Sequence, residues 1–196
     1  MIWLDFALEV LVRRMDWEDL ELEAATRGMM DGTLSTLGVV IGAQGAPAEV
    51  IIAAGISGGL ANSFSNIFAA FTAYETELMI DLNELKDAML RKDMRETKIY
   101  SDGRSEVHKQ SLADGVATAF GALVPVTPYF FFSSHMSIFI AIFLTSLLGL
   151  FVGIVMGKIS RRSMIKSGLK MAVSAIIVGI LSSFVQSGLS SVLPRS

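Results

Sequence analysis

The chain has 196 residues, of which 52% are hydrophobic and 18% charged, with a formal net charge of −3 and a mean hydropathy of +0.56. It contains no cysteine, which excludes a disulfide framework, a thiolate nucleophile and a cysteine-based zinc site. The small negative charge gives no support for nucleic acid as a partner. Residues 29–74, 111–157 and 171–194 together carry only three charged residues. These long apolar blocks predict an integral membrane protein whose surroundings are a lipid bilayer.

Breaks within the apolar blocks divide them into helices of membrane-spanning length. About 20 apolar residues cross a bilayer as a helix, and Gln44–Pro47 and Ser133–His135 interrupt the two longest blocks. Pro125 and Pro128 are expected to kink the third helix. The predicted fold class is therefore all-α, a polytopic membrane protein with an N-terminal amphipathic helix and five transmembrane helices near residues 29–46, 48–74, 111–132, 136–157 and 170–192.

The polar segments complete the predicted organisation. An amphipathic helix over residues 1–27 is expected to lie in the membrane interface. Transmembrane helices 1 and 2 then occupy 28–74, a short cytoplasmic helical segment occupies 75–110, and transmembrane helices 3–5 occupy 111–192. In the cytoplasmic segment we predict a helix to about residue 98, followed by a turn at Ser101–Gly103. Its carboxylate row is compatible with a solvated helix face or with the collection of divalent cations.

The distribution of basic residues predicts the orientation. Fifteen of the sixteen lysines and arginines fall in the segments that five spans place on one side of the membrane. Cytoplasmic loops carry this excess, so the N-terminus is predicted to be cytoplasmic and the C-terminus outside. In a prokaryote this would be the cell membrane.

Polar residues recur at similar depths within three predicted spans. At about 1.5 Å per residue, these residues form two layers near the cytoplasmic side. Burying an ionisable group in a membrane costs free energy unless the group faces a partner or a water-filled path. Hydrogen bonds between helices explain such layers, and so does an oxygen-lined cation site of the kind that suits Mg, Mn or Fe(II). The layers consist of Asp31, Asp114 and Asn66, then Ser35, Thr118 and Asn62.

Small residues and a short repeat mark the same helices. The pattern D-G-x-x-[ST]-x-x-G occurs at 31–38 and again at 114–121, as expected for a duplicated two-helix unit. Glycines four residues apart at Gly38 and Gly42, and at Gly55 and Gly59, permit close helix approach. We expect them to serve packing, including packing at a dimer interface.

Four stretches together resemble the vacuolar iron transporter family. The first helix carries Gly28-x-x-Asp31-Gly32-x-x-Ser35-Thr36, and the second carries Ala54-Gly55-x-x-x-Gly59 followed by Glu75. The third carries Gly121-Ala122-Leu123-Val124-Pro125, and the last loop carries Lys166-Ser167-Gly168-Leu169-Lys170. Their order within a five-span chain carries the resemblance, which covers about residues 26–75 and 111–190.

The resemblance implies a homodimer that moves Fe(II), and often Mn(II), out of the cytosol in exchange for protons. It implies that Asp31 lines the path at the dimer interface. Ser63 and Asn66 stand where the family usually has a methionine and a glutamate. Glu75 matches the first carboxylate of the family's cytoplasmic metal-binding domain, which is much shortened here. The candidate metal ligands are Asp31, Ser35, Asn62, Ser63, Asn66, Glu75, Asp114 and Thr118.

The predicted function is thus export of a divalent metal by proton antiport, with the metal ion as cargo and no cofactor. A passive divalent-cation channel and a non-transporting membrane scaffold are the alternatives. The predicted spans contain no nucleophile–base pair and no H-E-x-x-H motif, so an enzyme is not expected.

Overall fold

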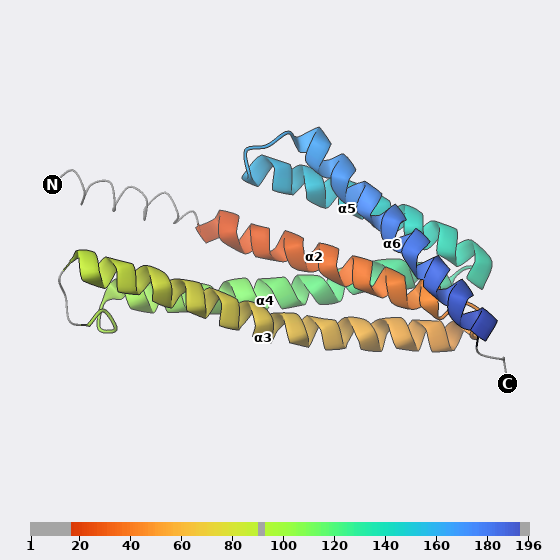
Figure 1. The fold of residues 1–196 in the computed structure, drawn as a ribbon, viewed down its shortest axis with the longest axis horizontal. Helices are drawn as coiled ribbons and strands as arrows, with labels where there is room; N and C mark the ends of the chain where they lie inside the picture. Colours follow the sequence, from red (N-terminus) through yellow and green to blue (C-terminus); the bar gives the residue numbers. More distant parts are fainter. Residues whose placement is uncertain (1–16, 90–92, 193–196) are drawn as a thin grey trace.

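The computed structural model describes residues 17–89 and 93–192, and these ranges fold into helices, with no β-strand among them (Figure 1). A short irregular turn separates α2 from α3, where Gly45 has a positive φ of 99°. A 3-10 turn, η1, separates α4 from α5. The elements are α2 (Trp17–Gly42), α3 (Ala48–Ala88), α4 (Lys98–Val126), η1 (Thr127–Phe130), α5 (Ser134–Ile159) and α6 (Met164–Val192).

Helix α2 is the centre of the arrangement. It packs along α4 over most of its length, contacts α3, and is covered elsewhere by the α5–α6 hairpin (Figure 1). Its apolar half is fully enclosed, since Leu37, Val40 and Ile41 are all 0% exposed. These side chains form one core with Val126 of α4 and Ala141 of α5. Burial of these apolar side chains holds α2, α4 and α5 together.

Three of the described helices are long and apolar enough to cross a membrane: α3, α5 and α6. The structure therefore supports an all-helical membrane protein, whereas the predicted count of five spans is not confirmed by length and composition. The two helices below the threshold, α2 and α4, carry Asp31 and Asp114. They are also the pair most extensively packed within the bundle; Asp114 is buried there, whereas Asp31 is exposed.

The segment over 75–110, predicted to be cytoplasmic, contains the last turns of α3 and the first turns of α4. Helix α3 runs unbroken for 41 residues, about 60 Å at 1.5 Å per residue. It extends side by side with the first half of α4 (Figure 1).

The turn predicted at Ser101–Gly103 is wrong. These residues lie inside α4, whose N-cap is Thr97, with its side chain accepting a hydrogen bond from the Tyr100 amide. A β-carbon at Gly103 would lie 2.5 Å from Cδ1 of Leu78. The glycine therefore allows close packing of α4 on α3 rather than a reversal of the chain.

The first and third predicted helices have different limits from those expected. Most of the predicted interfacial helix, residues 1–16, lies outside the described residues, and residues 17–27 form the first turns of α2. Pro125 lies in the last turn of α4, and Pro128 lies in η1. The prolines therefore coincide with the end of the third helix, since proline supplies no amide hydrogen to continue it.

The glycine pair of α3 packs inside the subunit. A β-carbon at Gly55 would lie 2.5 Å from the Val126 side chain, and one at Gly59 would lie 2.4 Å from the Ala122 β-carbon. Both residues are buried against α4, so they serve helix packing within the subunit; a dimer contact by this part of α3 stays a prediction. Gly42 has no atom within 4 Å of such a carbon.

Candidate functional site

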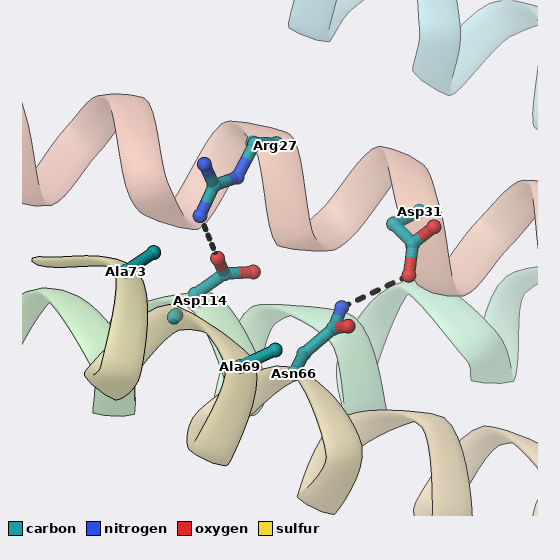
Figure 2. A pocket seen from close by; sticks show the side chains of 7 residues that line it. Arg27, Asp31, Asn66, Ala69, Ala73 and Asp114 are labelled. Atoms are coloured by element: carbon teal, nitrogen blue, oxygen red, sulfur yellow. Dashed lines mark hydrogen bonds and ion pairs between the residues drawn. The ribbon is translucent and has the colours of Figure 1, made fainter.

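A groove opens between α2, α3 and α4, and two aspartates line it (Figure 2). Its volume is about 330 Å³. One wall is made of alanines of α3, whose small side chains leave the space open. The lining residues are Arg27, Asp31, Asn66, Ala69, Ala70, Ala73 and Asp114.

Asp31 is held by two amides from the neighbouring helix. The Nδ2 atoms of Asn62 and Asn66 both donate to Oδ2 of Asp31, at 2.7 and 2.9 Å. Asn62 and Asn66 are four residues apart on α3, so one helix face presents both amides. The side chain of Asp31 itself stays exposed at the surface of the subunit. Two neutral donors thus orient a carboxylate that forms no ion pair with any of the described residues.

A second polar layer adjoins the first, as the sequence predicted. Asn62 also donates to Oγ of Ser35 at 3.0 Å, and Asn66 donates to Oγ1 of Thr118 at 2.9 Å. Thr118 in turn donates to the backbone carbonyl of Asp114 at 2.8 Å. The structure therefore joins five predicted ligands in one network: Asp31, Ser35, Asn62, Asn66 and Thr118.

Asp114 belongs to a different contact within the same groove. Its carboxylate is paired with the guanidinium of Arg27 on α2 (Figure 2). The Asp114 side chain is 4% exposed, whereas that of Arg27 is 55% exposed. Arg27 also donates to the hydroxyl of Tyr74 at 2.9 Å, and its guanidinium lies 5.6 Å from the centre of that ring. A buried carboxylate is thus balanced by a cation at the open side of the groove.

Backbone contact between α2 and α4 places Asp114. A β-carbon at Gly28 would lie 2.1 Å from the carbonyl oxygen of Asp114, and one at Gly32 would lie 1.9 Å from that of Thr118. The two parallel helices can approach this closely only because both positions lack a side chain. This approach brings Asp114 within reach of Arg27, one residue before Gly28.

Two predicted ligands lie elsewhere. Ser63 is 7% exposed and donates from its hydroxyl to the carbonyl of Gly115 at 2.6 Å, so it joins α3 to α4. Glu75 is partly buried on α3 and does not line the groove. Neither side chain is brought to the Asp31 network.

The donor set is one of hard ligands. Carboxylate, amide and hydroxyl oxygens suit Mg²⁺, Mn²⁺ and Fe²⁺ better than copper. Within the described part of the chain, no three His, Cys, Asp or Glu residues cluster as a metal site. The two asparagines donate nitrogen to Asp31, and an amide that rotates by half a turn presents its oxygen instead. The same residues can therefore stabilise a bare carboxylate or coordinate a cation beside it.

Sequence reasoning missed Arg27 and Tyr74. The available signal was the position of Arg27 four residues before Asp31, which places both on one helix face. Tyr74 lies eight residues after Asn66, about two turns further along the same helix. The contacts of Arg27 with Tyr74 of α3 and with Asp114 of α4 depend on how the three helices pack.

Comparison with known proteins identifies the family. A sequence model of the VIT family matches residues 74–187, more than half of the chain. The chain belongs to the VIT family. This confirms the resemblance to vacuolar iron transporters, for a member with a short cytoplasmic segment. Membership in this family indicates an integral membrane protein with a role in metal ion transport, rather than an enzyme.

A relative in an archaeon extends the match over more of the chain. The uncharacterized protein MJ0645 of Methanocaldococcus jannaschii is 40% identical over 163 residues, covering 82% of this chain and 85% of that protein. The VIT match begins at residue 74, so it covers the last turns of α3 and the helices from α4 onward. Four members of the Asp31 network, Asp31, Ser35, Asn62 and Asn66, lie before the matched range, and Thr118 lies within it.

Proposed function

We propose that this VIT family protein transports a divalent cation, Fe(II) or Mn(II), out of the cytosol through the groove that contains Asp31. The observation that carries this proposal is the exposed carboxylate of Asp31, held by Asn62 and Asn66 between two helices of a membrane bundle. A carboxylate at this depth is costly unless it faces water, a partner or an ion. A divalent cation supplies the missing positive charge.

The exposure of Asp31 favours a homodimer. Its side chain, with those of Ala69 and Ala73, lies at the surface of the isolated subunit, where lipid would be a poor solvent for a charge. A second copy placed over this face would enclose the groove and supply further oxygens by symmetry. The path would then run between the two subunits.

The ends of the helices favour the predicted orientation. The α3–α4 connection and the α5–α6 turn lie toward the same end of the molecule, and the end of α6 lies at the other (Figure 1). The segments around the first two, residues 75–110 and 158–170, carry twelve of the sixteen lysines and arginines, so we place that end in the cytoplasm. The groove lies near the middle of α3, between Asn66 and Ala73, and cytosolic metal would reach it from that end.

Proton antiport completes the proposal. When the cation leaves, the groove loses its positive charge, and an entering proton can replace part of that charge. When a cation arrives, the proton is released. The exchange couples metal export to proton entry without any further group.

Metal flux into proteoliposomes tests this function. The purified chain is reconstituted with a fixed pH gradient, and uptake of Fe(II), Mn(II), Co(II), Zn(II) and Mg(II) is followed beside empty vesicles. Fe(II) or Mn(II) uptake that dissipates the pH gradient is the expected result. Flux that ignores the gradient would indicate a passive channel. No flux of any of the five ions from active reconstitutions would leave the scaffold as the remaining function.

A further inference from the structure

Arg27 and Asp114 form an ion pair in which one side chain is exposed and the other is buried. The Asp114 side chain is 4% exposed and its backbone is in direct contact with α2 at Gly28, so the carboxylate is fixed. The Arg27 side chain is 55% exposed and sits at the open side of the groove. The cation is therefore the movable partner of the pair.

The groove offers room for that movement. The α3 wall facing Arg27 consists of Ala69, Ala70 and Ala73, which leave a volume of about 330 Å³. Tyr74 provides a second resting contact for the guanidinium, through its hydroxyl and its ring. Arg27 can thus leave Asp114 without losing every partner.

Removal of Arg27 is favourable only when another cation replaces it. A buried carboxylate left alone carries a large desolvation cost. Arg27 is tethered beside Asp114 and acts there as a monovalent cation of high effective concentration. A monovalent ion gains no electrostatic advantage over it, whereas a divalent ion attracts the carboxylate about twice as strongly at equal distance.

We propose that Arg27 is a tethered cation that occupies Asp114 until a divalent cation displaces it, and that it thereby excludes monovalent cations from the groove. This inference rests on the proposed function of the same groove. In the empty state, Asp114 is neutralised by Arg27. In the loaded state, the guanidinium moves toward Tyr74, and Asp114 joins Asp31 in facing the metal. Arg27 is then a residue that determines specificity by charge.

The two halves of the pair should affect metal affinity in opposite directions. In Arg27→Gln the competitor is gone, and Mn²⁺ should bind about tenfold more tightly. In Asp114→Asn the freed guanidinium remains near Asp31, and Mn²⁺ should bind about tenfold more weakly. Arg27→Lys keeps the charge and should restore affinity to within about threefold of the parent. A pair that served only to hold α2 on α4 would weaken binding in both Arg27→Gln and Asp114→Asn.

The measurement is the Mn²⁺ dissociation constant of the full chain in detergent, by titration calorimetry. Each titration is run in NaCl and in choline chloride at equal ionic strength. The parent should give the same value in both salts, whereas Arg27→Gln should bind Mn²⁺ more weakly in NaCl, because Na⁺ now competes. Equal values for Arg27→Gln in both salts would overturn the exclusion of monovalent ions.

A second measurement uses the parent protein, so that it stands even if Arg27→Gln fails to fold. Phenylglyoxal modifies exposed guanidinium groups, and mass spectrometry locates the product at Arg27. Saturating Mn²⁺ should raise the rate of modification severalfold as Arg27 leaves Asp114, while exposed Arg104 serves as the internal control. An unchanged rate with Mn²⁺ bound would refute the displacement. A parent that binds no divalent ion would instead contradict the proposed function itself.

Discussion

Gly32 of α2 lies so close to Thr118 of α4 that a β-carbon at Gly32 would be 1.9 Å from the Thr118 carbonyl oxygen. The two helices therefore touch through their backbones, at the layer where Thr118 accepts a hydrogen bond from Asn66. The contact sets the spacing of the polar network as well as the packing of the bundle. Both residues belong to the short repeat shared by the two helices.

Gly32→Ala should destabilise the protein by about 3 kcal/mol, because the added methyl group forces two backbones apart. Gly42→Ala is the matched control on the same helix, since no atom lies within 4 Å of the new carbon. Thermal unfolding in detergent should show a clear loss for the first variant and little change for the second. Equal midpoints for the two variants would contradict backbone contact at Gly32.

Asp31→Asn should reduce metal flux at least tenfold while the protein still folds. The substitution removes the charge but keeps a carbonyl oxygen that can accept from Asn62 and Asn66. Glu49→Gln, an exposed carboxylate in the first turn of α3, is the control. Flux of Mn(II) and the melting temperature are measured for both. Undiminished flux in a folded Asp31→Asn protein would remove the groove from the proposed path.

Asn66→Glu should tighten Mn(II) or Fe(II) binding, because it adds a second carboxylate beside Asp31 and restores the charge that the family usually carries there. The empty protein should become less stable, since two carboxylates then face each other without a cation. Asn83→Glu, an exposed position near the end of α3, controls for the added charge. Calorimetric titration of both variants and the parent separates a local effect from a general one.

Glu106 predicts a dependence of stability on pH. It lies in α4 before the predicted third span and is 4% exposed, and burial raises its pKa above the ordinary 4.5. The folded protein therefore binds more protons than the unfolded chain, and the contribution of Glu106 to stability falls as pH rises above about 4.5.

Glu106→Gln removes this penalty, and its melting temperature should exceed that of the parent at neutral pH. The difference should shrink as the pH falls toward 4.5, where the parent carboxyl is increasingly protonated. Glu96→Gln, on an exposed residue just before α4, should show no such trend. Melting curves between pH 4 and 8 provide the measurement, and parallel curves for Glu106→Gln and the parent would count against a raised pKa at Glu106.

The membrane orientation can be tested without removing any native thiol, because the chain has no cysteine. Single cysteines at Ser101 and at Ser191 replace exposed residues of α4 and α6. An impermeant thiol reagent should label the first from the cytoplasmic side alone and the second from the other side alone. Labelling of both from one side would rule out an odd number of spans.

The membrane class, the helical fold and the residues of the two polar layers could be predicted from the sequence. These features depend on the lengths of apolar blocks and on helix periodicity, which are local properties. The same reasoning placed Asp31, Asn62 and Asn66 at neighbouring depths, and they form one network. The family resemblance also came from short motifs that can be read in order along the chain.

The packing of the helices sets which face each residue presents and which partner it contacts, and this could not be predicted from the sequence. Ser101–Gly103 resembles a turn in sequence, but Gly103 lies inside α4, where Leu78 of α3 packs against it. Ser63 and Asn62 are adjacent in sequence, yet one joins α4 and the other joins Asp31. Asp114 is predicted at the same depth as Asp31, but it is paired with Arg27. The close approach of α2 to α4 at Gly28 brings the two charges together. The depth of a residue along a helix follows from its residue number. The partner of its side chain depends on which neighbouring helix packs against that face.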